Sequence, residues 1–203
     1  MNPNNLSEQD NELYQKGIAA LRKQNYDYAI ELFQQVLEIY PDFSVCLHDL
    51  WRTSREKRNS LPPSIFQRVI EKIKIGILSL KFIYLLTLGK LESAISVQKT
   101  IILLSPNCTP AFYRLATTFL RQGKTNLAKT AWEEILFINK KNVGALRQLA
   151  RLYYEEKDYK KSTATARMLL SVQAHDLQAE TILKDIAALD TIEEGFDNFK
   201  PAT

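Results

Sequence analysis

The stretch that decides the fold is GKLESA, residues 89–94, because the chain returns to its pattern at a fixed interval. GKTNLA follows at 123–128, and after an equal interval KDYKKS stands at 157–162. A related copy, QNYDYA, lies near the N-terminus at 24–29. Each copy joins a short polar break to a small residue. A fixed period of about 34 residues indicates one supersecondary unit that has been copied and stacked.

Large apolar residues flank each break at the spacing i, i+3, i+4, i+7, which predicts an amphipathic helix on either side. Small residues fall where two such helices must approach closely, and a larger side chain there would overpack the contact by about 1–3 kcal/mol. The chain is therefore expected to be all-α. The small residues are Gly17, Ala116 and Ala150 on the first helices, and Ala29, Ala94, Ala128 and Ser162 on the second.

This skeleton resembles the tetratricopeptide repeat, a helix–turn–helix family with a period of about 34 residues. The matching residues are Leu13, Gly17, Tyr26, Ala29, Phe33 and Pro41 in the first unit, and Gly123, Ala128 and Trp132 in the fourth. The resemblance covers residues 9–175 and implies a right-handed α-solenoid of about five units. The expected units are 9–42, 43–74, 75–108, 109–142 and 143–175.

Both ends of the chain are expected to differ from the array. Residues 1–8 form a polar N-terminal extension, and 176–189 are amphipathic, as expected of a helix that caps the open end of a solenoid. Residues 190–203 carry four acidic residues against Lys200. We expect this acidic stretch to be a flexible tail.

The second unit breaks the period, since the interval from Ala29 to Ala94 falls short of two full repeats. Residues 43–57 predict a first helix, the stretch 58–63 ends in Pro62-Pro63, and a helix resumes from Ser64. Residues 64–88 could form one long helix or two helices with a tight turn near Gly76. We expect two.

The sequence carries no catalytic or cofactor-binding motif. His48 and His175, the two histidines, lie in different units, and the six glycines are scattered rather than gathered into a phosphate-binding loop. Cys46 and Cys108 have no metal-ligand spacing and read as small buried hydrophobes. We therefore expect a protein that is not an enzyme and that holds neither a cofactor nor a metal.

The expected location is the cytoplasm. The first ten residues lack the basic start and apolar core of a signal peptide. The longest apolar stretch, Ile75–Leu88, contains Lys81 and is too short to span a bilayer. This stretch is expected to be the inner helix of the third unit.

The resemblance implies a function in protein binding, as an adaptor or scaffold. First helices of this family line a concave groove through their fifth, ninth and twelfth positions. Tyrosine and arginine at these positions suit a protein or peptide partner, and the arginines suit an acidic one, although the same arginines could equally be solubilising charge. The candidate groove residues are Tyr14, Ile18, His48, Arg52, Arg55, Tyr113, Thr117, Arg147, Arg151 and Tyr154.

Charge supplies an alternative function. The whole chain carries a net charge of +4, whereas residues 51–74 alone carry seven basic and two acidic residues, a net of +5. This basic second unit could serve a peripheral membrane or complex-assembly factor. Base-stacking aromatics do not interleave with the basic residues, which argues against nucleic acid.

One known mode of partner binding can be tested on the sequence. Members of the family that bind chaperone tails grip a terminal carboxylate with a lysine and an asparagine on the first helix. Tyr14 and Ile18 occupy the matching positions here and cannot form this charged clamp.

Overall fold

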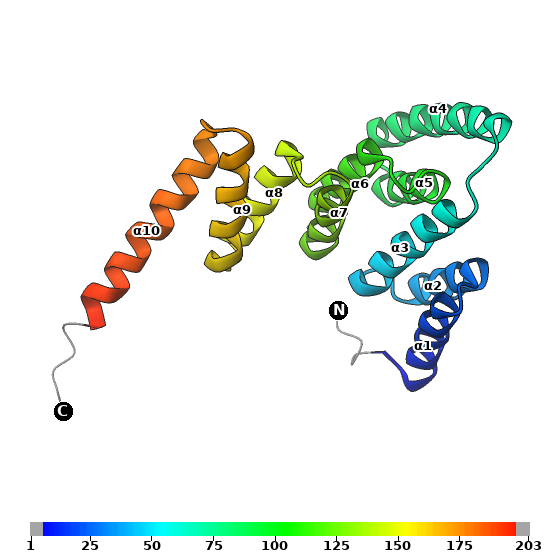
Figure 1. The fold of residues 1–203 in the computed structure, drawn as a ribbon, viewed down its shortest axis with the longest axis horizontal. Coiled ribbons are helices and arrows are strands. Elements are labelled where there is room, and N and C mark those ends of the chain that lie inside the picture. The colour runs from blue at the N-terminus through cyan, green and yellow to red at the C-terminus, as the bar shows by residue number, and fades with distance from the viewer. Residues whose placement is uncertain (1–5, 198–203) are drawn as a thin grey trace. The chain divides into compact units, whose positions relative to one another are not determined.

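The structure, a computed structural model, describes residues 6–197, apart from the side chains of residues 190 and 192–197. Ten helices and no strand lie within residues 6–197, so the all-α prediction is confirmed. The chain divides into two compact units, unit 1 ending at Glu134 and unit 2 beginning at Ile135. Figure 1 shows the course of the chain within each unit.

Unit 1 holds the first six helices of the chain and most of the seventh. These helices are α1 (Glu8–Arg22), α2 (Tyr26–Ile39), α3 (Ser44–Ser60), α4 (Ile65–Thr87), α5 (Leu91–Leu104), α6 (Thr109–Arg121) and α7 (Thr125–Ile138). Unit 2 holds the end of α7 with α8 (Val143–Glu155), α9 (Tyr159–Val172) and α10 (Leu177–Asp197).

A residue in the left-handed backbone region closes four of the helix–helix turns. Gly89 and Gly123 have φ of 69° and 72°, and Gln24 and Lys157 have φ of 59° and 62°. These are the polar breaks of the repeat. Glycine enters this region without steric cost, whereas glutamine and lysine lack that freedom.

The small repeat residues mark close helix contacts, as the sequence predicts. Ala29, Ala94 and Ser162 are fully buried. A Cβ added to Gly17 would lie 2.6 Å from the ring of Phe33, so α1 and α2 could not keep this contact with a larger residue. Serine replaces the usual alanine at position 162, and its hydroxyl donates a 2.9 Å hydrogen bond to the carbonyl of Ala150.

Residues 65–87 form one helix, α4, so the expected turn near Gly76 is absent. A capping box starts the helix, in which the Gln67 backbone N–H donates to the Ser64 hydroxyl and the Gln67 side chain accepts from the Ser64 N–H. The next glycine, Gly89, lies just beyond the end of α4. One interior glycine costs a helix only about 1 kcal/mol, so Gly76 by itself does not end α4.

The single helix leaves the second repeat without a second helix of its own. α4 packs along α5, the next helix in the chain, and its Phe82 and Leu85 are buried (Figure 1). α3 instead contacts α2 and α5, and its Trp51 meets the ring of Phe112 on α6 edge-on at 5.0 Å.

In unit 2, α10 packs on both α8 and α9. Their shared core contains Leu146, Ala150, Ala166, Leu169, Ala179, Ile182 and Ile186. The helix continues to Asp197, into the stretch expected to be a flexible tail, so that expectation was wrong for residues 190–197. Residues 198–203 of the expected tail lie outside the described residues.

No helix within residues 6–197 combines the length and the apolar character needed to cross a membrane.

Candidate functional site

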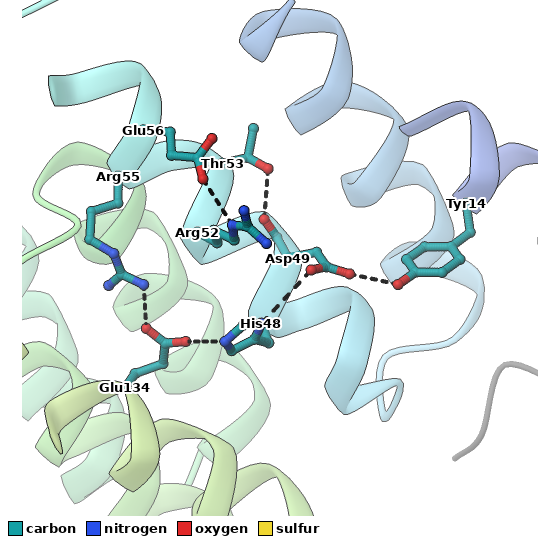
Figure 2. A network of polar contacts seen from close by, with 8 residues as sticks. All are labelled: Tyr14, His48, Asp49, Arg52, Thr53, Arg55, Glu56 and Glu134. Carbon is teal, nitrogen blue, oxygen red and sulfur yellow. Dashed lines mark hydrogen bonds and ion pairs between the residues drawn. The ribbon is translucent and has the colours of Figure 1, made fainter. Parts of the chain in front are cut away.

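A network of polar side chains runs along α3 in unit 1 and reaches α1 and α7 (Figure 2). It includes three of the candidate groove residues on α3, namely His48, Arg52 and Arg55. They lie within two turns of one helix, and the structure gives them different surroundings. His48 and Arg52 are exposed, whereas Arg55 is buried.

Glu134, on α7, is the buried acid of this network. Its Oε2 accepts a 2.6 Å hydrogen bond from Nη2 of Arg55, and its Oε1 lies 3.2 Å from Nε2 of His48. The Glu134 side chain is 1% exposed and that of Arg55 9% exposed. An ion pair this deep adds little net stability, but either partner left alone would be a buried charge without compensation. Arg55 therefore anchors α3 rather than facing solvent.

Tyr14 is also part of the interior. Its ring packs against those of Phe33 and Phe43, and its hydroxyl donates a 2.6 Å hydrogen bond to the Asp49 carboxylate. Burial, together with the hydrogen bond to Asp49, raises the pKa of the Tyr14 phenol. The tyrosine thus ties α1 to α3 at neutral pH.

His48 lies between two carboxylates and remains half exposed. Its Nδ1 is 3.8 Å from Asp49 and its Nε2 is 3.2 Å from Glu134. The Asp49 carboxylate raises the pKa of His48, partial burial opposes this, and Glu134 adds to the increase. The charged imidazolium is therefore favoured.

Arg52 follows His48 by one helical turn, and its side chain is 57% exposed and paired with Glu56 at 2.8 Å. His48 and Arg52 are exposed basic side chains, each paired with a carboxylate, beside a buried network that holds α3 in place (Figure 2). We call these two residues the α3 basic pair.

The remaining candidates of unit 1 are less prominent. Tyr113, on α6, is exposed, and its ring meets that of Trp132 edge-on at 4.6 Å. Ile18 and Thr117 are half-buried. The Thr117 hydroxyl donates to carbonyls of its own helix, including that of Arg114 at 2.9 Å.

In unit 2, the three candidates on α8 all have partners within the fold. Arg147 donates two hydrogen bonds to Oδ2 of the buried Asp176, at 3.0 and 2.5 Å. Oδ1 of Asp176 accepts from the N–H of Ala179 at 3.0 Å and so caps α10. Tyr154 packs against the ring of Tyr159, and Arg151 pairs with Glu155 at 3.4 Å.

The buried position of Asp176 affects its ionisation. Burial acts to raise the pKa of this carboxyl, but the hydrogen bonds from Arg147 and Ala179 outweigh it and hold the pKa below its usual value.

Sequence reasoning missed a cavity of about 410 Å³ in unit 1, on the side of α3 that carries Ser54, Lys57 and Arg58. Lys57 pairs there with Asp27, and Arg58 donates to Glu71 at 2.7 Å and to the carbonyl of Leu104 at 2.7 Å. The shortened period was the available signal, because a repeat without its second helix leaves space beside the first. The cavity is lined by residues of α2, α3, α4 and α5 and by Leu61 and Pro63 of the connecting segment.

The two cysteines are not paired with each other. Cys46 and Cys108 are free thiols, and burial raises the pKa of Cys46. Among the residues that the structure describes, no group of three or more histidine, cysteine, aspartate and glutamate side chains is arranged to hold a metal ion.

Two stretches of the sequence match family models described as tetratricopeptide repeat, residues 11–43 and residues 110–136. No curated protein matches the sequence. Among solved structures, the first tetratricopeptide-repeat domain of Spaghetti (RPAP3), bound to the HSP90 peptide SRMEEVD, is 15% identical with a TM-score of 0.51. The match covers 58% of this chain and 94% of the Spaghetti chain.

The tetratricopeptide-repeat domain of Arabidopsis OM64 is 18% identical with a TM-score of 0.50, and the match covers 58% of this chain and 98% of that domain. At these identities the likeness concerns the fold alone.

Proposed function

Because this chain is a tetratricopeptide-repeat protein, we propose that it is a non-catalytic adaptor that holds a segment of a partner protein against the first helices of unit 1. The observation that carries the proposal is the α3 basic pair, His48 and Arg52, exposed above a buried and hydrogen-bonded support. A binding surface gains affinity when its side chains are already held in place, because less conformational freedom is lost on binding.

The support is shared among three helices. Tyr14 of α1 holds Asp49, while Glu134 of α7 holds both Arg55 and His48. Arg52 is paired with Glu56, and both ring nitrogens of His48 lie near carboxylates, so a partner would contact the exposed parts of these two side chains. Tyr113 adds an exposed aromatic ring on α6, of the kind that supplies rigid contact area in interfaces.

The charge of the surface favours an acidic partner segment. Arg52 is a guanidinium, which can bind a carboxylate through two parallel hydrogen bonds, and the environment of His48 favours its cationic form. The neighbour solved with SRMEEVD binds an acidic peptide, but Tyr14, at the position of the charged clamp, is buried here. We therefore propose a different mode of contact, centred on α3.

Arg147 and Arg151 of α8 form a second and weaker candidate surface. Arg147 is committed to Asp176, so it offers a partner only the exposed third of its side chain. We place the adaptor in the cytoplasm, in keeping with its two free cysteines.

Reversing the charge of Arg52 tests the proposal. Partners captured from a lysate of the native organism and identified by mass spectrometry should bind Arg52→Glu about tenfold more weakly than the unchanged protein, a loss of about 1.4 kcal/mol. The affinity of each recovered partner is then measured by titration calorimetry.

Lys16→Glu is the matched control. The Lys16 side chain is 57% exposed, as that of Arg52 is, and pairs with Glu12 within its own helix as Arg52 pairs with Glu56. It should bind partners as tightly as the unchanged protein. Equal loss in both variants, or no loss in Arg52→Glu, would refute the assignment of the surface.

A further inference from the structure

Helix α4 has two apolar faces, and only one of them packs against another helix. Phe82 and Leu85 are buried where α4 packs along α5. The opposite face exposes large apolar side chains along the whole helix. We call them the outer face of α4: Ile65, Phe66, Val69, Ile73, Ile77, Leu80, Ile83, Tyr84 and Leu88, each between 49% and 82% exposed.

This outer face is continuous rather than a scatter of single residues. At 100° per residue its side chains fall within about 140° of the helix circumference, and a helix of this length extends about 35 Å. Among the described side chains, no other helix exposes more than two large apolar residues. Single exposed hydrophobes are ordinary, but a contiguous apolar patch marks a surface that something else covers.

Basic residues border the outer face on both sides. Lys72 lies along one margin, and Lys74 and Lys81 lie along the other, and all three are exposed. The one acid in α4, Glu71, points away from this face and is paired with Arg58. Whatever covers the outer face therefore meets positive charge at both margins.

A second copy of the chain fits this charge poorly. Pairing two α4 helices antiparallel about Gly76 and Ile77 would place Ile73 against Leu80, but it would also bring Lys74 beside the copy's Lys81. A parallel pair would bring Lys72 of one copy beside Lys74 of the other. In either pairing like charges meet at the margin, which destabilises a helix pair.

Two other occupants are a single helix of a partner protein and a lipid bilayer, and the width of the outer face distinguishes them. A single partner helix covers a narrow seam of one helix, whereas a bilayer surface covers a broad arc and receives flanking lysines among its headgroups. We propose that the outer face of α4 docks on an anionic lipid bilayer, with α4 lying in the plane of the interface. The aliphatic and aromatic side chains enter the boundary region, and the three lysines contact lipid phosphates and carboxylates.

This proposal is independent of the adaptor surface, because it uses no residue of the α3 basic pair. It is tested by co-sedimentation of the full chain with vesicles of phosphatidylcholine alone and of phosphatidylcholine with phosphatidylserine. Binding is expected only to the anionic vesicles and should weaken as salt is added. Each lysine changed to glutamine should weaken it by about fivefold.

The apolar contribution is tested with two matched double variants. Ile73→Ser/Leu80→Ser removes side chains that are 58% and 71% exposed, and Ile39→Ser/Leu177→Ser removes side chains that are 57% and 78% exposed at other places. The first variant should lose about tenfold or more in vesicle affinity. The second should bind as the unchanged protein does, and circular dichroism should show both to be folded.

Three outcomes would overturn the proposal. The unchanged protein fails to bind anionic vesicles, or the two double variants bind equally well. The third is a dimer, detected by light scattering, that does not bind vesicles and that Ile73→Ser/Leu80→Ser converts to a monomer. That result would assign the outer face to a second copy.

Discussion

Helices α3 and α8 are both first helices of a repeat, and both place an arginine on a buried carboxylate, yet they are held in different ways. α8 packs against α9, the next helix in the chain, and against α10. α3 packs against the preceding helix, α2, and because the helix that follows it packs on α5, residues far along the chain complete its support. Trp51 meets Phe112 of α6, and Arg55 meets Glu134 across a separation of 79 residues.

The difference shows what a repeat loses when the helix that follows its first helix packs elsewhere, as α4 packs on α5 instead of on α3. Around α8 the apolar surface is covered by neighbours, and the exposed large hydrophobes described in 139–189 are only Met168 and Leu177. Around α3 a cavity opens on one side, and the continuous helix α4 carries an uncovered apolar face. Buried charge then has a larger part in fixing α3.

Removing Arg55 should have the largest effect on stability. Arg55→Met would leave Glu134 buried with only His48 beside it, and we expect the free energy of unfolding of unit 1 to fall by about 3–5 kcal/mol. Replacing both partners, Arg55→Met with Glu134→Leu, should restore much of this, since neither charge is then buried alone. Urea unfolding followed by circular dichroism measures both.

Arg52→Met is the control on the same helix. Its ion pair with Glu56 is exposed, and exposed pairs contribute only about 0–1 kcal/mol. If Arg52→Met and Arg55→Met destabilise the protein equally, the long-range ion pair does not anchor α3.

Removing the arginine of α8 should cost less. The Arg147 side chain is 36% exposed against 9% for Arg55, and Asp176 keeps its hydrogen bond from Ala179. We expect Arg147→Met to destabilise unit 2 by about 1–2 kcal/mol. A loss larger than that of Arg55→Met, measured in the same urea series, would reverse the comparison between the two helices.

The pair of Arg147 and Asp176 makes the stability of unit 2 depend on pH. The folded pKa of Asp176 lies below its unfolded value, so its contribution is fully present above the unfolded pKa and is lost as pH falls through the folded one. Unfolding followed from about pH 6 down to about pH 2 should show a smaller acid-induced loss in Arg147→Met than in the unchanged protein. Equal losses would contradict the role of Arg147.

The repeat period predicts the regular hairpins well, because each is defined by local features. A polar break, a small residue and apolar residues at helical spacing are all visible near Ala94 and Ser162. The course of α4 was not predictable in the same way, since Gly76 is compatible with either a turn or a continuing helix. A glycine costs a continuing helix only about 1 kcal/mol, too little to decide between them.

The candidate site, too, could be predicted only in part from the sequence. Position within the repeat identified His48, Arg52 and Arg55, but it could not indicate which of them points outward. That depends on Glu134, a residue of another repeat that carries no local signal.

The turns that follow α3 and α8 provide a smaller test. Lys157 closes the turn after α8 with φ of 62°, whereas Leu61 follows α3 with φ of −127°, where any residue fits. Lys157→Gly should stabilise unit 2 by up to about 1 kcal/mol, because glycine removes the left-handed strain. Leu61→Gly should give no gain in thermal unfolding. A gain at both positions would mean that the gain at Lys157 does not come from relief of left-handed strain, because glycine by itself favours the unfolded chain.

His48 should give the smallest effect on stability, and the sign of that effect depends on pH. The folded pKa of His48 is raised, so its ion pairs contribute fully below the unfolded pKa of about 6.5 and are lost as pH rises through the folded pKa. Because the side chain is 48% exposed, the contribution should stay below about 1 kcal/mol. Unit 1 of His48→Gln should therefore be less stable than that of the unchanged protein at about pH 5.5 and equal to it at about pH 9. A difference that persists at high pH would mean that His48 acts through packing, and that the positive charge of the α3 basic pair comes from Arg52 alone.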